Sequence, residues 1–279
     1  MVRRVLARLL SGSLVLAGFG PLYLLAKQAI TPELESFAWP PFWLPHRLTA
    51  AHLRAVFALS ELRSVLARSL AVAALSAVLA TALGAMLGYA MARGRRERAA
   101  GLGLISVTRL LPMIAVAIPL ALALIVLGLY DTQSGIGLAL VHGAVALPTA
   151  VLTSFSGFAG LPVELEEAAW LDGAGPLRAF FSVVLPAVRP FLAATFILTF
   201  LLSWDEFGFA LLIQVTHRTL PPLLYYYTVF GDVGPASALA LVMLLPAIAV
   251  VVMLRPMLGQ TTALSALPGG VAPGERRDA

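Results

Sequence analysis

Six apolar stretches, each long enough to cross a bilayer as a helix, recur along this chain of 279 residues. A transmembrane helix needs about 20 predominantly apolar residues. The stretches lie at residues 9–30, 69–92, 110–129, 135–157, 191–213 and 236–258. Only 12% of the residues are charged, about half the share found in soluble domains. We therefore expect an all-α, polytopic membrane protein with six transmembrane helices in a single domain, residues 1–279.

The arginines predict how these spans are oriented. If the N-terminus is cytoplasmic, most of the 19 basic residues fall on the cytoplasmic side, including a dense cluster at 93–98. The positive-inside rule then predicts an N-in/C-in topology. The loop 31–68 is periplasmic in this arrangement, and the loop 161–190, between spans 4 and 5, is cytoplasmic.

The two ends of the chain have distinct compositions. The first apolar stretch is longer than the core of a signal peptide, about 7–15 residues, so we interpret it as a retained helix. The glycine-rich, charged tail at 268–279 predicts a flexible segment.

Several classes of function are excluded by composition. The chain has no cysteine, which rules out thiolate metal sites and cysteine nucleophiles. Its arginines lie at the ends of apolar runs instead of along one basic stripe, so we expect contact with membrane lipid and none with nucleic acid.

The loop 161–190 has the composition of structured helix. Pro162 suits a helix start, acidic residues follow in the first turns, where they complement the helix dipole, and Asp172-Gly173 ends the helix. A second helix is predicted from near Pro176 to about residue 185. Its apolar face is expected to pack on the bundle while the acidic side and the glycine elbow face the cytosol; this apolar face comprises Leu177, Phe180, Phe181 and Val184.

Three short motifs occupy this loop: Glu167-Ala168-Ala169, Asp172-Gly173-Ala174 and Val184-Leu185-Pro186. Their order and spacing resemble the EAA loop of binding-protein-dependent ABC importer permeases. Further segments similar to the maltose-type carbohydrate subfamily are Tyr89-Ala-Met-Ala-Arg93, Leu129-Tyr-Asp-Thr132, Ala146-Leu-Pro148 and Ser203-Trp-Asp-Glu-Phe207. The chain departs from that subfamily at Arg68 and Asp205, where asparagine is usual.

The resemblance implies a permease subunit that moves a sugar or similar small polar solute inward by alternating access. The chain has no GxxxxGK[ST] phosphate loop, so it is expected to be non-catalytic and to bind no cofactor; a separate ATPase would use ATP and Mg. The implied ATPase-coupling residues are Glu167, Ala168, Ala169, Asp172, Gly173, Leu185 and Pro186.

The implied partners are a second permease subunit, either a paralogue or the same chain, two copies of the ABC ATPase and an extracytoplasmic solute-binding protein. The implied location is the bacterial cytoplasmic (inner) membrane, as a multi-pass protein.

Polar residues at membrane depth are costly and usually face a cavity or a partner. The candidates for the substrate path are Trp204, Asp205, Glu206 and Phe207. These acids could contact the solute, or they could form a structural hydrogen bond that holds a break in the fifth span. His142 is predicted to make a helix–helix hydrogen bond, and Gly84-x-x-x-Gly88 to permit close helix packing.

Two other classes remain as alternatives. A secondary transporter would use Asp205 and Glu206 for ion coupling, but it would not need the Glu-Ala-Ala–glycine elbow. An intramembrane enzyme would need a Ser/His, His/Glu or paired-Asp arrangement at matching depths, and the spans offer none.

Overall fold

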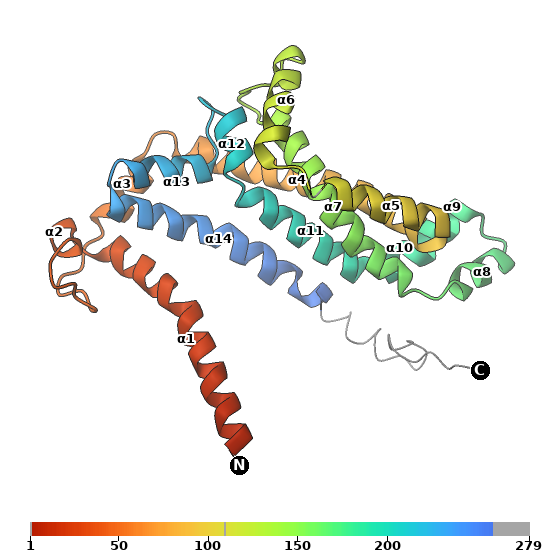
Figure 1. Ribbon diagram of the computed structural model, residues 1–279, viewed down its shortest axis with the longest axis horizontal. Coiled ribbons are helices and arrows are strands. Elements are labelled where there is room, and N and C mark those ends of the chain that lie inside the picture. Colours follow the sequence, from red (N-terminus) through yellow and green to blue (C-terminus); the bar gives the residue numbers. More distant parts are fainter. Residues whose placement is uncertain (1, 109, 259–279) are drawn as a thin grey trace. The chain divides into compact units, whose positions relative to one another are not determined.

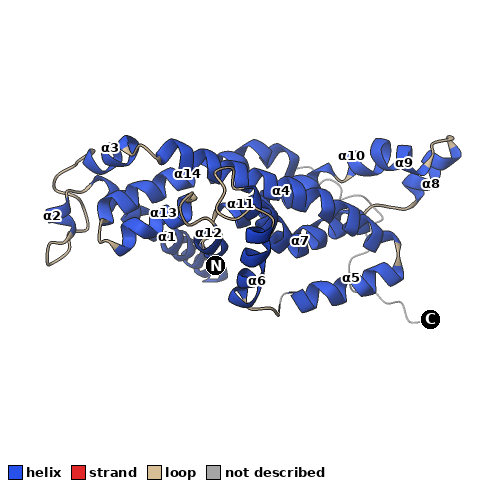
Figure 2. Cartoon of the chain, turned by 90° about the horizontal axis from the view of Figure 1, so that it is seen from above, coloured by secondary structure: helices blue, strands red, loops and turns tan. Residues whose placement is uncertain are grey.

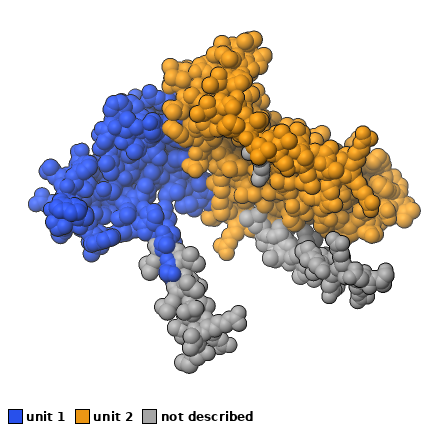
Figure 3. Space-filling model, viewed as in Figure 1, with its two compact units in different colours: residues 1–67, 218–248 blue, residues 68–217, 249–279 orange. Residues whose placement is uncertain are grey.

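The computed structural model of the chain describes residues 2–108 and 110–258 (Figure 1). The predicted flexible tail at 268–279 lies outside these residues. Helices and connecting loops make up the described part of the chain, in which no strand occurs (Figure 2). The helices belong to two compact units, residues 1–67 with 218–248 and residues 68–217 with 249–279 (Figure 3).

The first unit combines the N-terminal part of the chain with a segment near its C-terminal end. Its elements are α1 (Val2–Ile30), α2 (Glu33–Ser36), α3 (Ala51–Ala58), the start of α4 (Leu62–Arg93), α13 (Leu220–Val229) and most of α14 (Val233–Leu258). The end of α1 is tied to the segment that leads into α3, because the Thr49 amide donates to the Ile30 carbonyl at 2.8 Å. The short α3 lies where the apolar residues of the loop 31–68 follow a helical period.

The second unit contains the remaining helices. Its elements are the rest of α4, then α5 (Arg95–Thr108), α6 (Met113–Val126), α7 (Ile136–Ala159), α8 (Glu164–Leu171), α9 (Pro176–Ala179), the π-helical turn η1 (Phe180–Val184), α10 (Leu185–Ala187), α11 (Arg189–Trp204), α12 (Gly208–Ile213) and the end of α14. Helices α7 and α11 pack along each other (Figure 1).

Three described helices, α4, α7 and α14, are long and apolar enough to cross a membrane. Two bent pairs raise the number to five if each pair forms one span: α5 with α6, bent by 96°, and Pro176–Ala187 with α11, bent by 71°. The sequence predicts a loop between the second and third spans, but α5 occupies that segment. Its arginine- and glycine-containing start lacks the apolar period by which a helix is recognised.

The glycine pair in α4 allows that helix to approach α7 closely. A Cβ atom on Gly84 would lie 2.7 Å from the Ala150 Cβ, and one on Gly88 would lie 2.7 Å from the Phe155 backbone nitrogen. Real Cβ atoms do not come this close to their neighbours. The packing role predicted for Gly84-x-x-x-Gly88 is therefore confirmed.

Candidate functional site

Helix α8 ends in a defined turn, which we call the elbow (residues 172–175). The Gly173 amide donates to the Trp170 carbonyl at 3.0 Å, and the Ala174 amide donates to the Ala169 carbonyl at 2.9 Å. These two bonds form a Schellman motif, in which the residue after the helix cap takes a left-handed conformation. Gly173 has a φ of +83°, so the predicted helix end at Asp172-Gly173 is confirmed.

The chain after the elbow is helical from Pro176 to Ala187, with a π-helical turn in its middle. Its apolar residues separate into two pairs. Phe180 and Val184 pack against α4 and α7 beside Phe158, as the sequence predicts. The prediction is wrong for the other pair, Leu177 and Phe181, which are exposed. Residues three apart differ by about 60° around a helix, so the bundle covers only part of this wide apolar stripe.

Exposed apolar side chains flank the elbow on both sides. We call this set the elbow surface; it comprises Trp170, Leu171, Leu177 and Phe181. Leu171 is 90% exposed and Leu177 is 75% exposed. Clustered apolar groups of this kind on a protein surface mark sites of interaction with a protein or a membrane. Sequence reasoning did not identify these residues as exposed, because the apolar pattern alone does not tell which side of a helix is covered.

The residues predicted to couple to an ATPase lie around the same elbow. Glu167, Ala168, Asp172 and Gly173 are exposed, Ala169 is buried against the bundle, and Leu185 and Pro186 are half-buried. The structure thus gathers the first part of the motif at the exposed turn. The Leu-Pro ending of the motif lies in α10, where the elbow joins the bundle, just before the 71° bend that leads into α11.

One acidic residue of α8 does not face the cytosol as predicted. Glu166 is only 3% exposed. Its carboxylate accepts hydrogen bonds from the Tyr89 hydroxyl at 2.7 Å and from Arg93 Nε at 2.7 Å. The prediction that all acids of α8 point outward is therefore wrong, because a buried carboxylate is stable when it is paired and hydrogen-bonded.

The predicted fifth span is interrupted at residues 205–207, between α11 and α12. The Glu206 carboxylate accepts hydrogen bonds from the amides of Phe209 at 2.9 Å and Ala210 at 3.0 Å, which are otherwise unpaired at the start of α12. His142 Nε2 lies 3.0 Å from Glu206 Oε2, and His142 Nδ1 lies 2.8 Å from the Ser203 hydroxyl. Glu206 thus holds the break, and the helix–helix hydrogen bond predicted for His142 is confirmed. The expectation that the spans offer no Ser/His or His/Glu arrangement is wrong, because the packing of α7 on α11 brings His142 to both Ser203 and Glu206.

The other three candidates of the substrate path differ in accessibility. Trp204 is 3% exposed and stacks on Phe200, with ring centroids 5.9 Å apart and planes at 9°. Phe207 is half-buried, whereas Asp205 is exposed. In this conformation the Trp204 ring offers no open face to a solute, and Asp205 is the accessible polar group.

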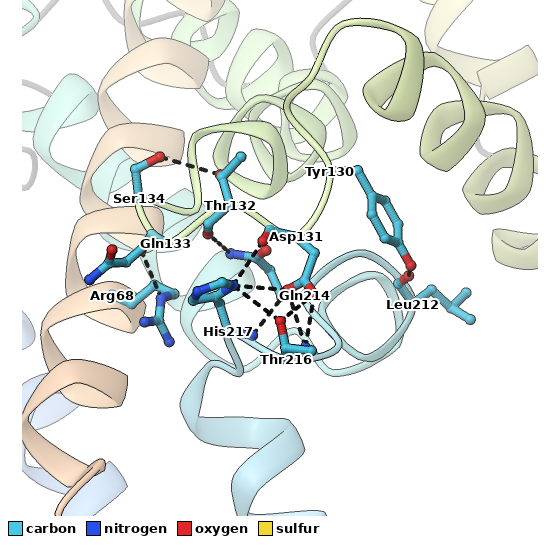
Figure 4. A network of polar contacts seen from close by, with 10 residues as sticks. All are labelled: Arg68, Tyr130, Asp131, Thr132, Gln133, Ser134, Leu212, Gln214, Thr216 and His217. Atoms are coloured by element: carbon cyan, nitrogen blue, oxygen red, sulfur yellow. Dashed lines mark hydrogen bonds and ion pairs between the residues drawn. The ribbon is translucent and has the colours of Figure 1, made fainter.

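A second polar network lies at the start of α7, the end away from the elbow, where residues 130–135 meet residues 212–217 (Figure 4). The Asp131 carboxylate accepts hydrogen bonds from the Thr216 and His217 amides, each at 3.0 Å. Burial raises the pKa of Asp131, but hydrogen bonds from the Thr216 hydroxyl and from both amides, with the His217 charge, outweigh it and leave the pKa below its usual range. This carboxylate therefore ties the two loops together in its charged form.

Arg68, one of the departures from the family pattern, belongs to the same network (Figure 4). Its Nε donates to the Gln133 carbonyl at 2.9 Å, and Gln214 Nε2 donates to the Thr132 carbonyl at 2.9 Å. Arg68 thus contributes to the connection between α4 and the loop that precedes α7.

The fold and these sites define a multi-pass, all-helical membrane protein with a fixed helical elbow at one end of its bundle. Residues 80–260 match the family described as the inner membrane component of binding-protein-dependent transport systems, and the chain belongs to this family.

Curated relatives and a solved structure agree with this assignment. The chain is 31% identical to the sulfoquinovosyl glycerol transport system permease protein SmoH of Agrobacterium fabrum over 252 residues, 88% of each chain. It is 33% identical to the trehalose transport system permease protein SugB of Mycobacterium tuberculosis over 181 residues, 63% of this chain and 64% of SugB. A chain in the crystal structure of a bacterial ABC transporter involved in the import of the acidic polysaccharide alginate has the same fold, with a TM-score of 0.74 at 19% identity, covering 91% of this chain and 96% of that one.

The chain is accordingly a non-catalytic permease subunit of an ABC importer. Importers of this family work with a partner permease, an ATPase and a solute-binding protein. The secondary-transporter alternative, which relied on Asp205 and Glu206, is not favoured, and the Glu206 carboxylate is engaged in holding the helix break.

Proposed function

We propose that this permease imports a sugar or a similar small polar solute by alternating access driven by a separate ATPase. The observation that carries the proposal is the elbow, in which a fixed left-handed turn presents exposed apolar side chains beside exposed Glu167. The sugar class is supported by relatives named for transport of trehalose and of sulfoquinovosyl glycerol.

In this proposal the chain forms one permease domain, residues 1–279, with six spans in an N-in/C-in topology in the bacterial cytoplasmic membrane. Support comes from the six apolar stretches, from α1 over the first of them, and from the arginine cluster at 93–98. The positive-inside rule places that cluster, and with it the elbow, in the cytoplasm.

We further propose that the elbow docks in a groove of the ATPase. Glu167 and Ala168 would contact the ATPase, while Asp172 and Gly173 would shape the turn that enters it. Ala169, Leu185 and Pro186 would fix the two helices to the bundle; the burial of Ala169 and the half-burial of the Leu-Pro pair support this division.

The complete importer would contain two copies of the ATPase, which bind ATP and Mg, a second permease that is either a paralogue or the same chain, and an extracytoplasmic solute-binding protein. This chain would bind no cofactor of its own.

Among the candidates of the substrate path, we infer that Asp205 contacts the solute, because it is exposed at the break between α11 and α12. Trp204, Glu206 and Phe207 would support that position by packing and hydrogen bonding. A carboxylate accepts hydrogen bonds from hydroxyl groups, the main polar groups of a sugar.

The test is uptake by the complete importer reconstituted in proteoliposomes. Radiolabelled trehalose, maltose and a glycosyl glycerol are supplied with the solute-binding protein, with and without internal ATP, and a labelled amino acid serves as the negative control. ATP-dependent accumulation of a glycoside supports the proposal. Accumulation of the amino acid alone would overturn the sugar class, and uptake driven by an ion gradient without ATP would overturn the ATPase coupling.

A further inference from the structure

Arg93, the last residue of α4, connects three helical elements at the base of the elbow. Its Nε donates to Glu166 Oε1 at 2.7 Å, and its Nη2 also contacts that oxygen. Its Nη1 donates to the Phe158 carbonyl at 3.1 Å, in the last turn of α7, and its Nη2 donates to the Leu161 carbonyl at 3.4 Å, just after that helix. One guanidinium therefore holds the end of α4, the end of α7 and the start of α8 together.

The carboxylate of this pair is enclosed on its other side as well. The Tyr89 hydroxyl, one helical turn before Arg93, donates to Glu166 Oε2 at 2.7 Å. The Glu166 side chain is 4% exposed and that of Arg93 is 18% exposed. Removing one partner from a buried ion pair leaves an uncompensated charge, so neither residue can be lost without disturbing the contact.

Aromatic side chains pack against Tyr89, which bonds to this ion pair. The Tyr89 ring lies edge-on to Phe158, with centroids 5.5 Å apart, and to Phe180, with centroids 4.9 Å apart. Phe180 belongs to the helical stretch after the elbow, so both arms of the elbow rest against Tyr89. The elbow is thus attached to α4 by contacts that do not involve α11, the helix that follows it in the chain.

We propose that Arg93 and Glu166, supported by Tyr89, form the joint through which movement of the elbow is transferred to α4. This inference rests on the proposed ATPase coupling and assigns the transfer to particular residues. They act as positioning residues, because they lie beneath the docking surface and not on it. A displacement of the elbow reaches α4 only if the elbow is firmly attached to that helix. Here the ion pair attaches α8 to the end of α4, a helix of 32 residues.

The test compares coupling with assembly in the reconstituted importer. The variants are Arg93→Gln, Glu166→Gln and the double variant; the matched control is Arg96→Gln, which removes an exposed arginine outside the joint. Three quantities are measured for each: the amount of ATPase that co-purifies, the ATP hydrolysis stimulated by the solute-binding protein, and the solute transported per ATP hydrolysed.

We expect each single variant to lower the solute transported per ATP by about tenfold, within the usual range of coupling between sites, while ATPase still co-purifies. The double variant should recover part of this ratio, because two neutral amides can hydrogen-bond without a buried unpaired charge. The Arg96→Gln control should match the unmodified importer.

Two outcomes would overturn the inference. One is a loss of assembled complex in the single variants with an unchanged transport ratio in what remains, which would make the pair purely structural. The other is an equal loss in the control. Failure of the proposed function itself is distinguishable, since the unmodified importer would then show no ATP-driven uptake.

Discussion

Replacement of Gly173 probes the backbone of the elbow without disturbing its packing. A Cβ atom at this position would meet no atom within 4 Å, but the φ of +83° is one that side chains rarely adopt. A residue other than glycine in a left-handed conformation costs about 1–2 kcal/mol. If ATPase binding needs this conformation, Gly173→Ala should weaken the apparent affinity for the ATPase by about 5- to 30-fold, and Gly173→Val by more, because β-branched residues are rarer still in this region.

The assay is titration of the purified ATPase onto the permease in nanodiscs, with the binding of each variant compared at equal permease content. Gly173→Asn separates backbone strain from steric obstruction. Asparagine is larger than alanine but tolerates the left-handed region better, so its affinity should lie between those of the glycine and alanine forms.

Gly175 provides the matched control, since its φ is −67° and its Cβ would also meet open space. We expect Gly175→Val to weaken ATPase binding less than Gly173→Val does, because Gly175 does not need the left-handed conformation. The reasoning from backbone conformation would be refuted if affinity followed side-chain size alone. In that case Gly173→Ala would bind better than Gly173→Asn, and Gly175→Val would be as impaired as Gly173→Val.

Three further predictions concern the bundle. Gly84→Ala should destabilise the purified protein by about 1–3 kcal/mol through overpacking, whereas Gly103→Ala, which meets open space, should not lower the midpoint of thermal unfolding. Asp131→Asn should lower that midpoint at neutral pH. The folded-state pKa of Asp131 is lowered, so its contribution to stability is full above the ordinary pKa and is lost as the pH falls through the lowered value. The unfolding midpoints of the variant and the unmodified chain should therefore converge as the pH falls below about 4. A constant difference across that range would contradict the tie between the two loops. Glu206→Ala should lower the midpoint of thermal unfolding by removing the hydrogen bonds to α12. Asp205→Asn should leave that midpoint unchanged and raise the KM for uptake. The reverse pattern would assign solute contact to Glu206 and the helix break to Asp205.

Sequence reasoning predicted those features that depend on local chemistry. The helix end at Asp172-Gly173 follows from glycine's access to the left-handed region, and the capacity of α4 for close packing follows from Gly84 and Gly88, although the identity of its partner, α7, was not predicted. Such features need only the residue and its immediate neighbours, so they are accessible without a structure.

The burial of Glu166 could not be predicted in the same way. Glu164, Glu166 and Glu167 are equivalent as helix formers, and it is the positions of Tyr89 and Arg93, 77 and 73 residues earlier, that select Glu166. One pattern in the sequence could have indicated a buried carboxylate. Tyr89 and Arg93 lie one helical turn apart at the end of the second span, and a run of carboxylates follows after the next two spans.

Side-chain direction was equally hidden on the second arm of the elbow. Leu177 and Phe181 carry the same apolar signal as Phe180 and Val184, but the bundle covers only the latter pair. Exposure depends on where neighbouring helices end, which the pattern along one helix does not contain. The two exposed residues are those now assigned to the elbow surface.

If the elbow docks in the ATPase groove as proposed, the elbow surface on either side of it contacts the ATPase. The chain has no cysteine, so a single Leu171→Cys substitution supplies one reactive thiol at a side chain that is 90% exposed. Cross-linking from this thiol to lysines of the assembled complex, followed by mass spectrometry, should give a product with the ATPase, and Val126→Cys, at a position that is 86% exposed at the end of α6, should give none. Absence of an ATPase product from Leu171→Cys in an importer that still transports its solute would contradict the account.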